Sequence, residues 1–499
     1  MKNSRVRLLG PFLLSMLSAA AHADDQQFPI MRFEVEGNHL LAPAAVQAVL
    51  QPMTGPARVY GDIQEALDAL RLAYRSAGYG TVQVDVPEQE LTSGVVRIAV
   101  TETALGKIVV SGNAHFDSAN VQASLPPLRV GQVPNLDALS VAIQLANDNP
   151  AKQVEVVLAS GDNESEVDAK VAVTDSRPLR GFVMLDNTGS ATSGRWRVGA
   201  ALQHANLFNR DHVATLAYTS SPDSPDGVKV NLYSLGYRIP LYALGDSLDF
   251  IYGSSSVNTP GVSPTLGGPL GLVGKGNVAG ARWNHFLPRR GDYSSKLVFA
   301  IDHKYINSRC SVGGVEVSFA PPTPAIASCV PYTTRPLSIS YSGQLQGEGE
   351  GRATEVNLAL ARNWATGQAY TNVDGRSDRY SYLTPGNRAS RDSFTVLRGG
   401  ASHFTGLPRD WQMRLAANGQ YAFNALLASE QFGMTGAGAV RGFGERALAA
   451  DNAVIVNAEL YTPELAAPLG LPGNLRALLY YDAGRGRNRQ SGAAVPDSL

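Results

Sequence analysis

The part of the sequence after Arg180 constrains the fold most, because it carries strand signals and almost no helix signal. Stretches of about ten residues alternate apolar and polar side chains and are separated by turn residues. Thirteen such stretches are found: Phe182–Asn187, Arg195–Asn206, Asp211–Thr219, Val228–Arg238, Ser247–Ser256, Val278–Phe286, Tyr293–Tyr305, Leu337–Gln346, Thr354–Trp364, Phe394–His403, Trp411–Phe423, Val454–Tyr461 and Arg476–Ala483.

The connections between these stretches alternate in length. Phe208-Asn209-Arg210 and Pro288-Arg289-Arg290-Gly291 are short turns, whereas residues 258–277 and 307–334 are long and rich in Gly, Ser and Pro. Short turns on one side and long loops on the other are typical of an antiparallel transmembrane β-barrel. A soluble β-sandwich, the alternative, would not need that alternation. We therefore predict a β-barrel over residues 180–499.

The preceding region contains an internal repeat. Phe33–Asn38 matches Ile108–Asn113, 75 positions later, and Val95–Glu102 matches Asp168–Asp175. Between these strands lie helical faces, formed by Ile63, Ala66, Leu67, Leu70 and Tyr74 in the first copy and by Leu136, Leu139 and Ile143 in the second. Each copy predicts the order strand, helix, helix, strand, strand. We expect two α+β modules, at residues 28–103 and 104–176; a generic duplication is the alternative.

The N-terminus predicts export. Lys2, Arg5 and Arg7 precede a short apolar run and the Ala21-His22-Ala23 site, a pattern typical of a cleavable signal peptide over residues 1–23. Removing it takes away three positive charges and no negative ones, so the formal net charge falls from −1 to −4. No basic surface is indicated, and nucleic acid is not expected as a partner.

The sequence contains two cysteines, Cys310 and Cys329. An even cysteine count in an exported protein favours one disulfide, here around a loop rich in Pro and Gly. A redox or metal pair is the alternative, but the spacing differs from C-x-x-C and no His lies nearby.

A glycine-rich stretch, Gly433–Arg446, separates two of the predicted strands. It contains five glycines in fourteen residues, with Arg441 and Phe443 near its centre. Such a loop, with a cation that cannot lose its charge, favours a functional role over a purely structural one.

The repeat resembles the polypeptide-transport-associated (POTRA) domain, and the chain as a whole resembles the two-partner secretion transporters that export haemolysins and filamentous adhesins. Seven stretches carry this resemblance in sequence order: Asn149–Gln153, Leu185–Gly189, His204–Phe208, Gly236–Tyr242, Leu287–Tyr293, Val440–Phe443 and Tyr480–Gly484. The resemblance implies two POTRA domains followed by a transmembrane β-barrel in the outer membrane, with the POTRA domains in the periplasm.

The resemblance also implies a site. In this family a Val-Arg-Gly-aromatic loop folds into the barrel lumen, and its Arg pairs with the Asp of an aromatic-x-Asp-x-Gly motif. Here these positions are Val440, Arg441, Gly442 and Phe443 in the loop and Asp482 and Gly484 on a strand. The guanidinium fork suits a carboxylate, and a charge inside a barrel needs a partner or water. The alternative is a solvated Arg441 and an Asp482 that only ends a strand.

The sequence departs from the family pattern in two places. Members carry a plug helix before the first repeat, but here only Asp24–Phe28 separate the signal peptide from the first strand, so we expect no plug. Family barrels have sixteen strands, whereas about thirteen are found before the sequence stops at Leu499. We therefore expect a C-terminal truncation and an incomplete barrel.

The function expected from these features is a protein-conducting channel. Its partners would be a secreted exoprotein of the adhesin, haemolysin or contact-dependent toxin type, bound by the POTRA domains, together with outer-membrane lipid and the barrel assembly machinery. The sequence has no phosphate-binding Lys loop, no G-x-S-x-G and no H-E-x-x-H. We expect no enzymatic activity, no cofactor and no metal. A barrel assembly factor and a passive porin are the alternatives.

Overall fold

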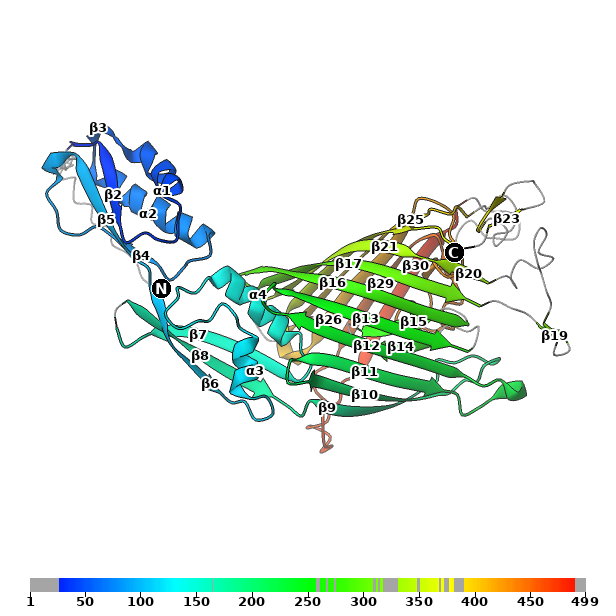
Figure 1. Cartoon of the computed structure of the whole chain (residues 1–499). Coiled ribbons are helices and arrows are strands. Elements are labelled where there is room, and N and C mark those ends of the chain that lie inside the picture. The colour runs from blue at the N-terminus through cyan, green and yellow to red at the C-terminus, as the bar shows by residue number, and fades with distance from the viewer. Residues whose placement is uncertain are drawn as a thin grey trace, which may run out of the picture. The chain divides into compact units, whose positions relative to one another are not determined.

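The computed structural model describes residues 27–489 except for 164, 257–260, 266–267, 273–274, 308–310, 313–314, 317–330, 348–350, 368, 372–376 and 381–389. The predicted signal peptide and the predicted Cys310–Cys329 disulfide lie outside the described residues. The chain divides after Thr103 into two compact units (Figure 1). None of the helices in the described ranges is long and apolar enough to cross a membrane.

The first unit is a three-stranded sheet packed against two helices. Its elements are β1 (Phe28–Ile30), β2 (Arg32–Glu36), α1 (Pro43–Leu50), β3 (Gly55–Arg58), α2 (Tyr60–Ser76), β4 (Gln83–Asp85) and β5 (Val95–Thr101). The closing strand β5 lies in the middle, parallel to β2 and antiparallel to β4. Helix α2 buries the five side chains of the predicted face, which confirms that helix. The small β1–β3 pair was not predicted.

The second unit begins with a module of the same design. Its elements are β6 (Ala104–Ser111), α3 (Ser118–Ala123), α4 (Leu136–Asn147), β7 (Lys152–Ser160) and β8 (Glu166–Asp175). Asp117 and Asn135 accept the N–H groups of Asn120 and Ala138 and so begin α3 and α4 with side-chain caps. The closing strand β8 again lies in the middle, parallel to β6 and antiparallel to β7. The predicted order of elements is confirmed in the second module and, apart from the small β1–β3 pair, in the first.

Both modules close their first strand with the same turn. Gly37 and Gly112 have φ values of +80° and +82°, and a Cβ at either position would lie 2.2 or 2.4 Å from a carbonyl oxygen of the closing strand. Only glycine is therefore compatible with either turn. In each module an acidic side chain at the end of the closing strand accepts the N–H groups just after this turn. Glu102 accepts from residues 39–40 in the first module, and Asp175 accepts from residues 114–116 in the second. The two modules therefore share the glycine turn and its acidic hydrogen-bond acceptor as well as their order of elements.

A large antiparallel sheet forms the rest of the second unit. Thirteen strands follow one another in chain order: β9 (Leu179–Asp186), β10 (Arg197–Leu207), β11 (His212–Ser220), β12 (Asn231–Leu241), β13 (Asp246–Ser255), β16 (Gly276–Arg290), β17 (Tyr293–Ile306), β21 (Pro336–Gln346), β22 (Ala353–Asn363), β25 (Thr395–Gly406), β26 (Gln412–Ala422), β29 (Asn452–Tyr461) and β30 (Leu478–Arg487). A fourteenth, β20 (Tyr332–Thr334), pairs with the end of β17. All thirteen predicted strands are confirmed in order.

The sheet curls back on itself, so that its early, green strands lie in front of its late, orange and red strands in Figure 1. Short paired segments extend from the long loops: β14 (Gly261–Thr265) with β15 (Gly268–Leu272), β18 (Ser311–Val312) with β19 (Val315–Glu316), and β23 (Tyr370–Thr371) with β24 (Ser377–Asp378). The ladder runs from β9 to β30, and among the described residues no pairing joins these two strands. The expected C-terminal truncation stays a prediction.

The two faces of the sheet differ in the sense expected for a membrane wall. On β11, Val213, Thr215, Ala217 and Thr219 are buried on the concave side, whereas Leu216 on the other face is exposed. Other strands repeat this pattern, with exposed apolar side chains on the outer face: Leu202, Leu235, Phe250, Trp283, Ile301, Ile339, Leu358, Leu415 and Val456. A soluble sheet would bury such residues, so this outer face suits lipid.

The second module packs directly on the turns at one end of this sheet. Lys152 of β7 forms an ion pair of 2.5 Å with Asp211, which immediately precedes β11, and both side chains are buried. Asn120 accepts a hydrogen bond from the same ammonium, and the Tyr242 hydroxyl donates to Asp211 at 2.6 Å. Burial lowers the pKa of Lys152, although the negative charge of Asp211 acts in the opposite direction. Burial and the charge of Asp211 both raise the pKa of Tyr242. The network joins β7, α3 and two turns of the sheet.

Two further contacts reinforce this junction. Arg238 of β12 holds Asp249 of β13 through a fork of 2.7 and 2.8 Å, and it also forms an ion pair with Asp148 at the end of α4. Gln144 of α4 donates to the carbonyl of Leu287 at 2.9 Å. The second module is therefore fixed to the large sheet at several points.

Candidate functional site

The candidate site is the loop between β26 and β29, residues 423–451, which is called the lumen loop from here on. Within it β27 (Phe432–Gly433) pairs with β28 (Ala449–Ala450) as a short hairpin. Met434 is buried against Ala450 of the hairpin and against Ala453 and Ile455 on the concave face of β29. The loop is thus folded onto the inner face of the sheet.

Glycines on the wall make room for this packing. A Cβ at Gly484 of β30 would lie 3.2 Å from Val440 and 3.4 Å from Met434, and one at Gly486 would lie 2.4 Å from the Met434 sulfur. Side chains at these inward positions would therefore push the lumen loop away from the wall. The predicted site residue Gly484 is at the contact, whereas Gly486 was not predicted.

Arg441 is enclosed by acidic and aromatic groups of the wall. Its Nε and Nη2 donate to the two carboxylate oxygens of Asp482, each at 2.7 Å, and its backbone N–H donates to the same carboxylate at 3.1 Å. Its Nη1 forms an ion pair of 2.9 Å with Glu459 of β29. The guanidinium also lies over the Tyr480 ring, 3.8 Å from its centre. The fork and the stack are specific to arginine.

The acidic partners of Arg441 are themselves held in place. Asn457 donates to Asp482 at 2.8 Å and to the carbonyl of Ala439 in the lumen loop at 2.9 Å. Arg414 forms an ion pair of 3.3 Å with Glu459. Asp482 and Glu459 are largely buried, so two carboxylates face two guanidiniums in a compact, charge-balanced cluster. Such buried charges are stabilised only when paired in this way.

The other predicted site residues surround Arg441. Val440 packs with Met434 and donates its N–H to the Met434 carbonyl at 3.0 Å. Gly442 has φ of +91°, a conformation that favours glycine. Phe443 is 60% exposed, so its ring does not contribute to the buried contact with the wall.

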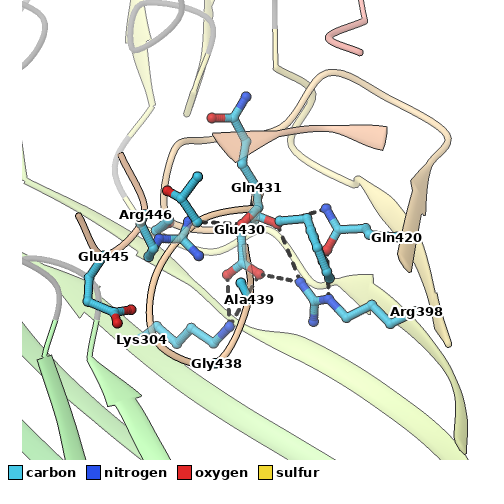
Figure 2. A pocket seen from close by; sticks show the side chains of 13 residues that line it. Lys304, Arg398, Gln420, Glu430, Gln431, Gly438, Ala439, Glu445 and Arg446 are labelled. Carbon is cyan, nitrogen blue, oxygen red and sulfur yellow. Dashed lines mark hydrogen bonds and ion pairs between the residues drawn. The ribbon is translucent and has the colours of Figure 1, made fainter. Parts of the chain in front are cut away.

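A second charged cluster holds the start of the lumen loop (Figure 2). The Glu430 side chain is 1% exposed; it accepts from Lys304 Nζ at 3.0 and 3.2 Å, from Thr334 at 3.0 Å and from Arg398 at 3.4 Å. Gln420 of β26 links Arg398 to the backbone carbonyl of Glu430. Beside this cluster lies a cavity of about 350 Å³, into which Figure 2 shows side chains of the loop and of the wall pointing.

Glu459, Asn457, Tyr480 and Glu430 were missed in the sequence. For Glu459 and Asn457 a signal existed, because they are two positions apart in the otherwise apolar run Ala453–Leu460. Polar residues on one face of a barrel strand point to the lumen. Tyr480 lies two residues before Asp482 and shares its face. Glu430 had no local signal, since its partners are far away in the sequence.

Comparisons with protein families match most of the chain. The model for the POTRA domain, ShlB-type, matches residues 28–103. The model for the haemolysin secretion/activation protein ShlB/FhaC/HecB matches residues 163–326 and 336–496, which is more than half of the chain.

Individual relatives have low sequence identity to this chain but align with most of its length. The heme/hemopexin transporter protein HuxB of Haemophilus influenzae is 20% identical over 478 residues, covering 94% of this chain and 78% of the relative. The outer membrane transporter CdiB of Dickeya dadantii (strain 3937) is 22% identical over 431 residues, covering 85% and 70%.

Solved structures show the same fold. CdiB from Escherichia coli superimposes with a TM-score of 0.69 at 19% identity, covering 97% of this chain and 84% of the other. CdiB from Acinetobacter baumannii gives a TM-score of 0.64 at 16% identity, covering 94% and 81%. The architecture of POTRA modules followed by a β-barrel is therefore shown, and the chain belongs to the haemolysin secretion/activation family, the outer-membrane transporters of two-partner secretion.

Proposed function

We propose that this transporter is a protein-conducting channel whose lumen loop is latched to the barrel wall through Arg441 and Asp482. The observation that carries this proposal is the enclosure of Arg441, with its fork on Asp482, its ion pair to Glu459 and its position over Tyr480. A loop tip held by so many contacts would keep one conformation, and a passing polypeptide would need that loop to move.

In this proposal the two modules, residues 28–103 and 104–176, are POTRA domains that receive an unfolded exoprotein in the periplasm. Each three-stranded sheet has edge strands, β2 and β4 in the first module and β6 and β7 in the second. An extended chain can add to such an edge through main-chain hydrogen bonds, which demand little of its sequence. The exoprotein then passes through the barrel in extended form.

The cargo class is proposed only in broad terms: an exoprotein of the adhesin, haemolysin or contact-dependent toxin type. One similar protein is named a heme/hemopexin transporter and another an outer membrane transporter. The family does not favour a barrel assembly factor or a passive porin. The channel performs no chemical step in this proposal, and the barrel assembly machinery would insert it.

Secretion assays in cells that carry the partner exoprotein test the latch. We expect Arg441→Ala and Asp482→Ala to lower secretion strongly, because each leaves buried charges without a partner. Arg441→Lys should also secrete poorly, since an ammonium cannot reproduce the fork and the stack on Tyr480. The matched control is Arg485→Ala, on the same strand as Asp482 but at an exposed position.

The amount of each variant in the outer membrane must equal that of the unaltered protein. Under that condition, normal secretion by both Arg441→Ala and Asp482→Ala would reject the latch. A defect in Arg485→Ala of the same size would show that the assay reports general damage to β30.

A further inference from the structure

The cluster around Glu430 and the cluster around Arg441 involve different strands of the wall and lie at different depths in the barrel. The partners of Arg441 are on β29 and β30, whereas Lys304 is on β17 and Arg398 on β25. Four strands, β26, β25, β22 and β21, lie between β29 and β17 in the sheet. At the usual spacing of strands, Lys304 on β17 is about 24 Å along the wall from β29, and Arg398 on β25 is about 10 Å from it.

The two clusters also lie at different heights in the barrel. Lys304 is two residues from the end of β17 that leads into a long loop, and Arg398 is close to the beginning of β25, which follows a long loop. This rim is opposite the turns that carry the second POTRA module. Asp482 lies in the middle of β30. The lumen loop is therefore held near the outer rim by Glu430 and deeper inside by Arg441.

We propose that Glu430 is a second, independent anchor of the lumen loop, which ties its base to Lys304 and Arg398 and keeps the outer mouth of the resting channel closed. The inference rests on the proposed function, in which the lumen loop keeps one conformation and must move for a polypeptide to pass. It assigns Glu430 as a positioning residue, because the carboxylate acts on the loop and not on the cargo.

Among the described residues, the hydrogen bonds to the Glu430 side chain come from Thr334, Lys304 and Arg398, and Arg446 is a further cation that lines the same cavity. The Glu430 carboxylate is fully enclosed. Removing its charge would leave Lys304 and Arg398 uncompensated beside a cavity of about 350 Å³. Unpaired buried charges are unstable, and the cavity gives the base of the loop room to shift.

Single-channel recording in planar lipid bilayers with the full-length protein tests this inference. We expect Glu430→Gln to raise the open probability on the order of tenfold or more, because breaking one partner of a buried pair is strongly destabilising. The same variant should make cells sensitive to a large antibiotic such as vancomycin. An open probability equal to that of the unaltered protein would overturn the proposal.

Glu445→Gln is the matched control. Glu445 is on the same loop and lines the same cavity, and its carboxylate accepts the N–H of Ala437 at 2.7 Å. No ion pair of Glu445 is found among the described residues. The variant makes the same change of charge and should conduct like the unaltered protein. Equal opening in Glu430→Gln and Glu445→Gln would overturn the anchor, since any loss of charge in the cavity would then suffice.

A double-mutant cycle separates an ion pair from general damage. Lys304→Met breaks the same contact from the wall and should open the channel similarly, and Lys304→Met with Glu430→Gln should open it no further than the single changes. If the effects of the two substitutions on open probability added fully, Lys304 and Glu430 would not act as an ion pair. Should Glu430→Gln fail to insert, Lys304→Met decides the question. Normal secretion by Arg441→Ala together with increased opening by Glu430→Gln would reject the Arg441 latch and leave the Glu430 anchor standing.

Discussion

Inward-facing glycines on β30 set how closely the lumen loop can approach the wall. A Cβ at Gly486 would lie 2.4 Å from the Met434 sulfur and 2.8 Å from Ala450, whereas a Cβ at Gly438 of the lumen loop would meet nothing within 4 Å. We expect Gly486→Ala to destabilise the packed loop by about 1–3 kcal/mol, the usual cost of overpacking. Limited proteolysis of the loop in the folded protein should show faster cleavage.

Gly438→Ala makes the same chemical change in open space and should leave the cleavage rate unaltered. If Gly486→Ala is cleaved no faster than Gly438→Ala, the loop does not pack on β30 as described. Gly484→Ala should fall between the two, because its nearest neighbours lie 3.1 to 3.4 Å from the added atom.

Only some residues of the candidate site could be predicted from the sequence. Arg441 and Asp482 were paired through the motifs of a family, not through any local signal, and the structure places them in contact. The burial of Glu430 depends on which strands face each other across the lumen. That arrangement follows from the curvature of the whole sheet and cannot be read from alternation along one strand.

At the scale of elements, the strands were predictable because two independent signals agreed. Alternation of side chains marked each strand, and turn residues marked its ends. The pairs β14–β15 and β23–β24 were missed, since they lie inside loops rich in Gly, Ser and Pro where alternation is weak. The docking of the second module was missed too, because Lys152 and Asp211 are 59 residues apart and carry no motif that links them.

This docking gives a prediction for β7 and the turn before β11. Lys152→Met would leave Asp211 buried without its cation, and the loss of one partner of a buried pair costs about 3–5 kcal/mol. We expect faster hydrogen exchange in the turn around Asp211 and in β7, and a lower temperature of unfolding for this region.

Lys107→Met serves as the comparison. Lys107 forms an ion pair of 2.5 Å with Asp162 in the same module, but both side chains are more than half exposed. Exposed pairs contribute little, so its exchange rates should match those of the unaltered protein. Equal behaviour of Lys152→Met and Lys107→Met would show that the buried network does not hold the module in place.

At the scale of the whole molecule, the two POTRA modules differ in how far they can be separated from the barrel. The main core of the first module contains only residues of that module, from Val46 to Val100. The core of the second module includes Ala205 and Val213 of the large sheet. The first module thus has a core of its own, whereas the second shares its core with the barrel.

Two deletions test this difference. Removing residues 28–103 should leave a barrel that inserts, shows heat-modifiable mobility in electrophoresis and conducts like the unaltered channel, because no core residue of the barrel is lost. Secretion should stop, since the proposed first site for the exoprotein is gone. Removing residues 28–176 should also destabilise the barrel, because Ala205 and Val213 lose their apolar neighbours and Asp211 loses Lys152. A barrel equally stable in both deletions would mean that the second module is an independent domain, and a barrel lost in the shorter deletion would mean that the first is not.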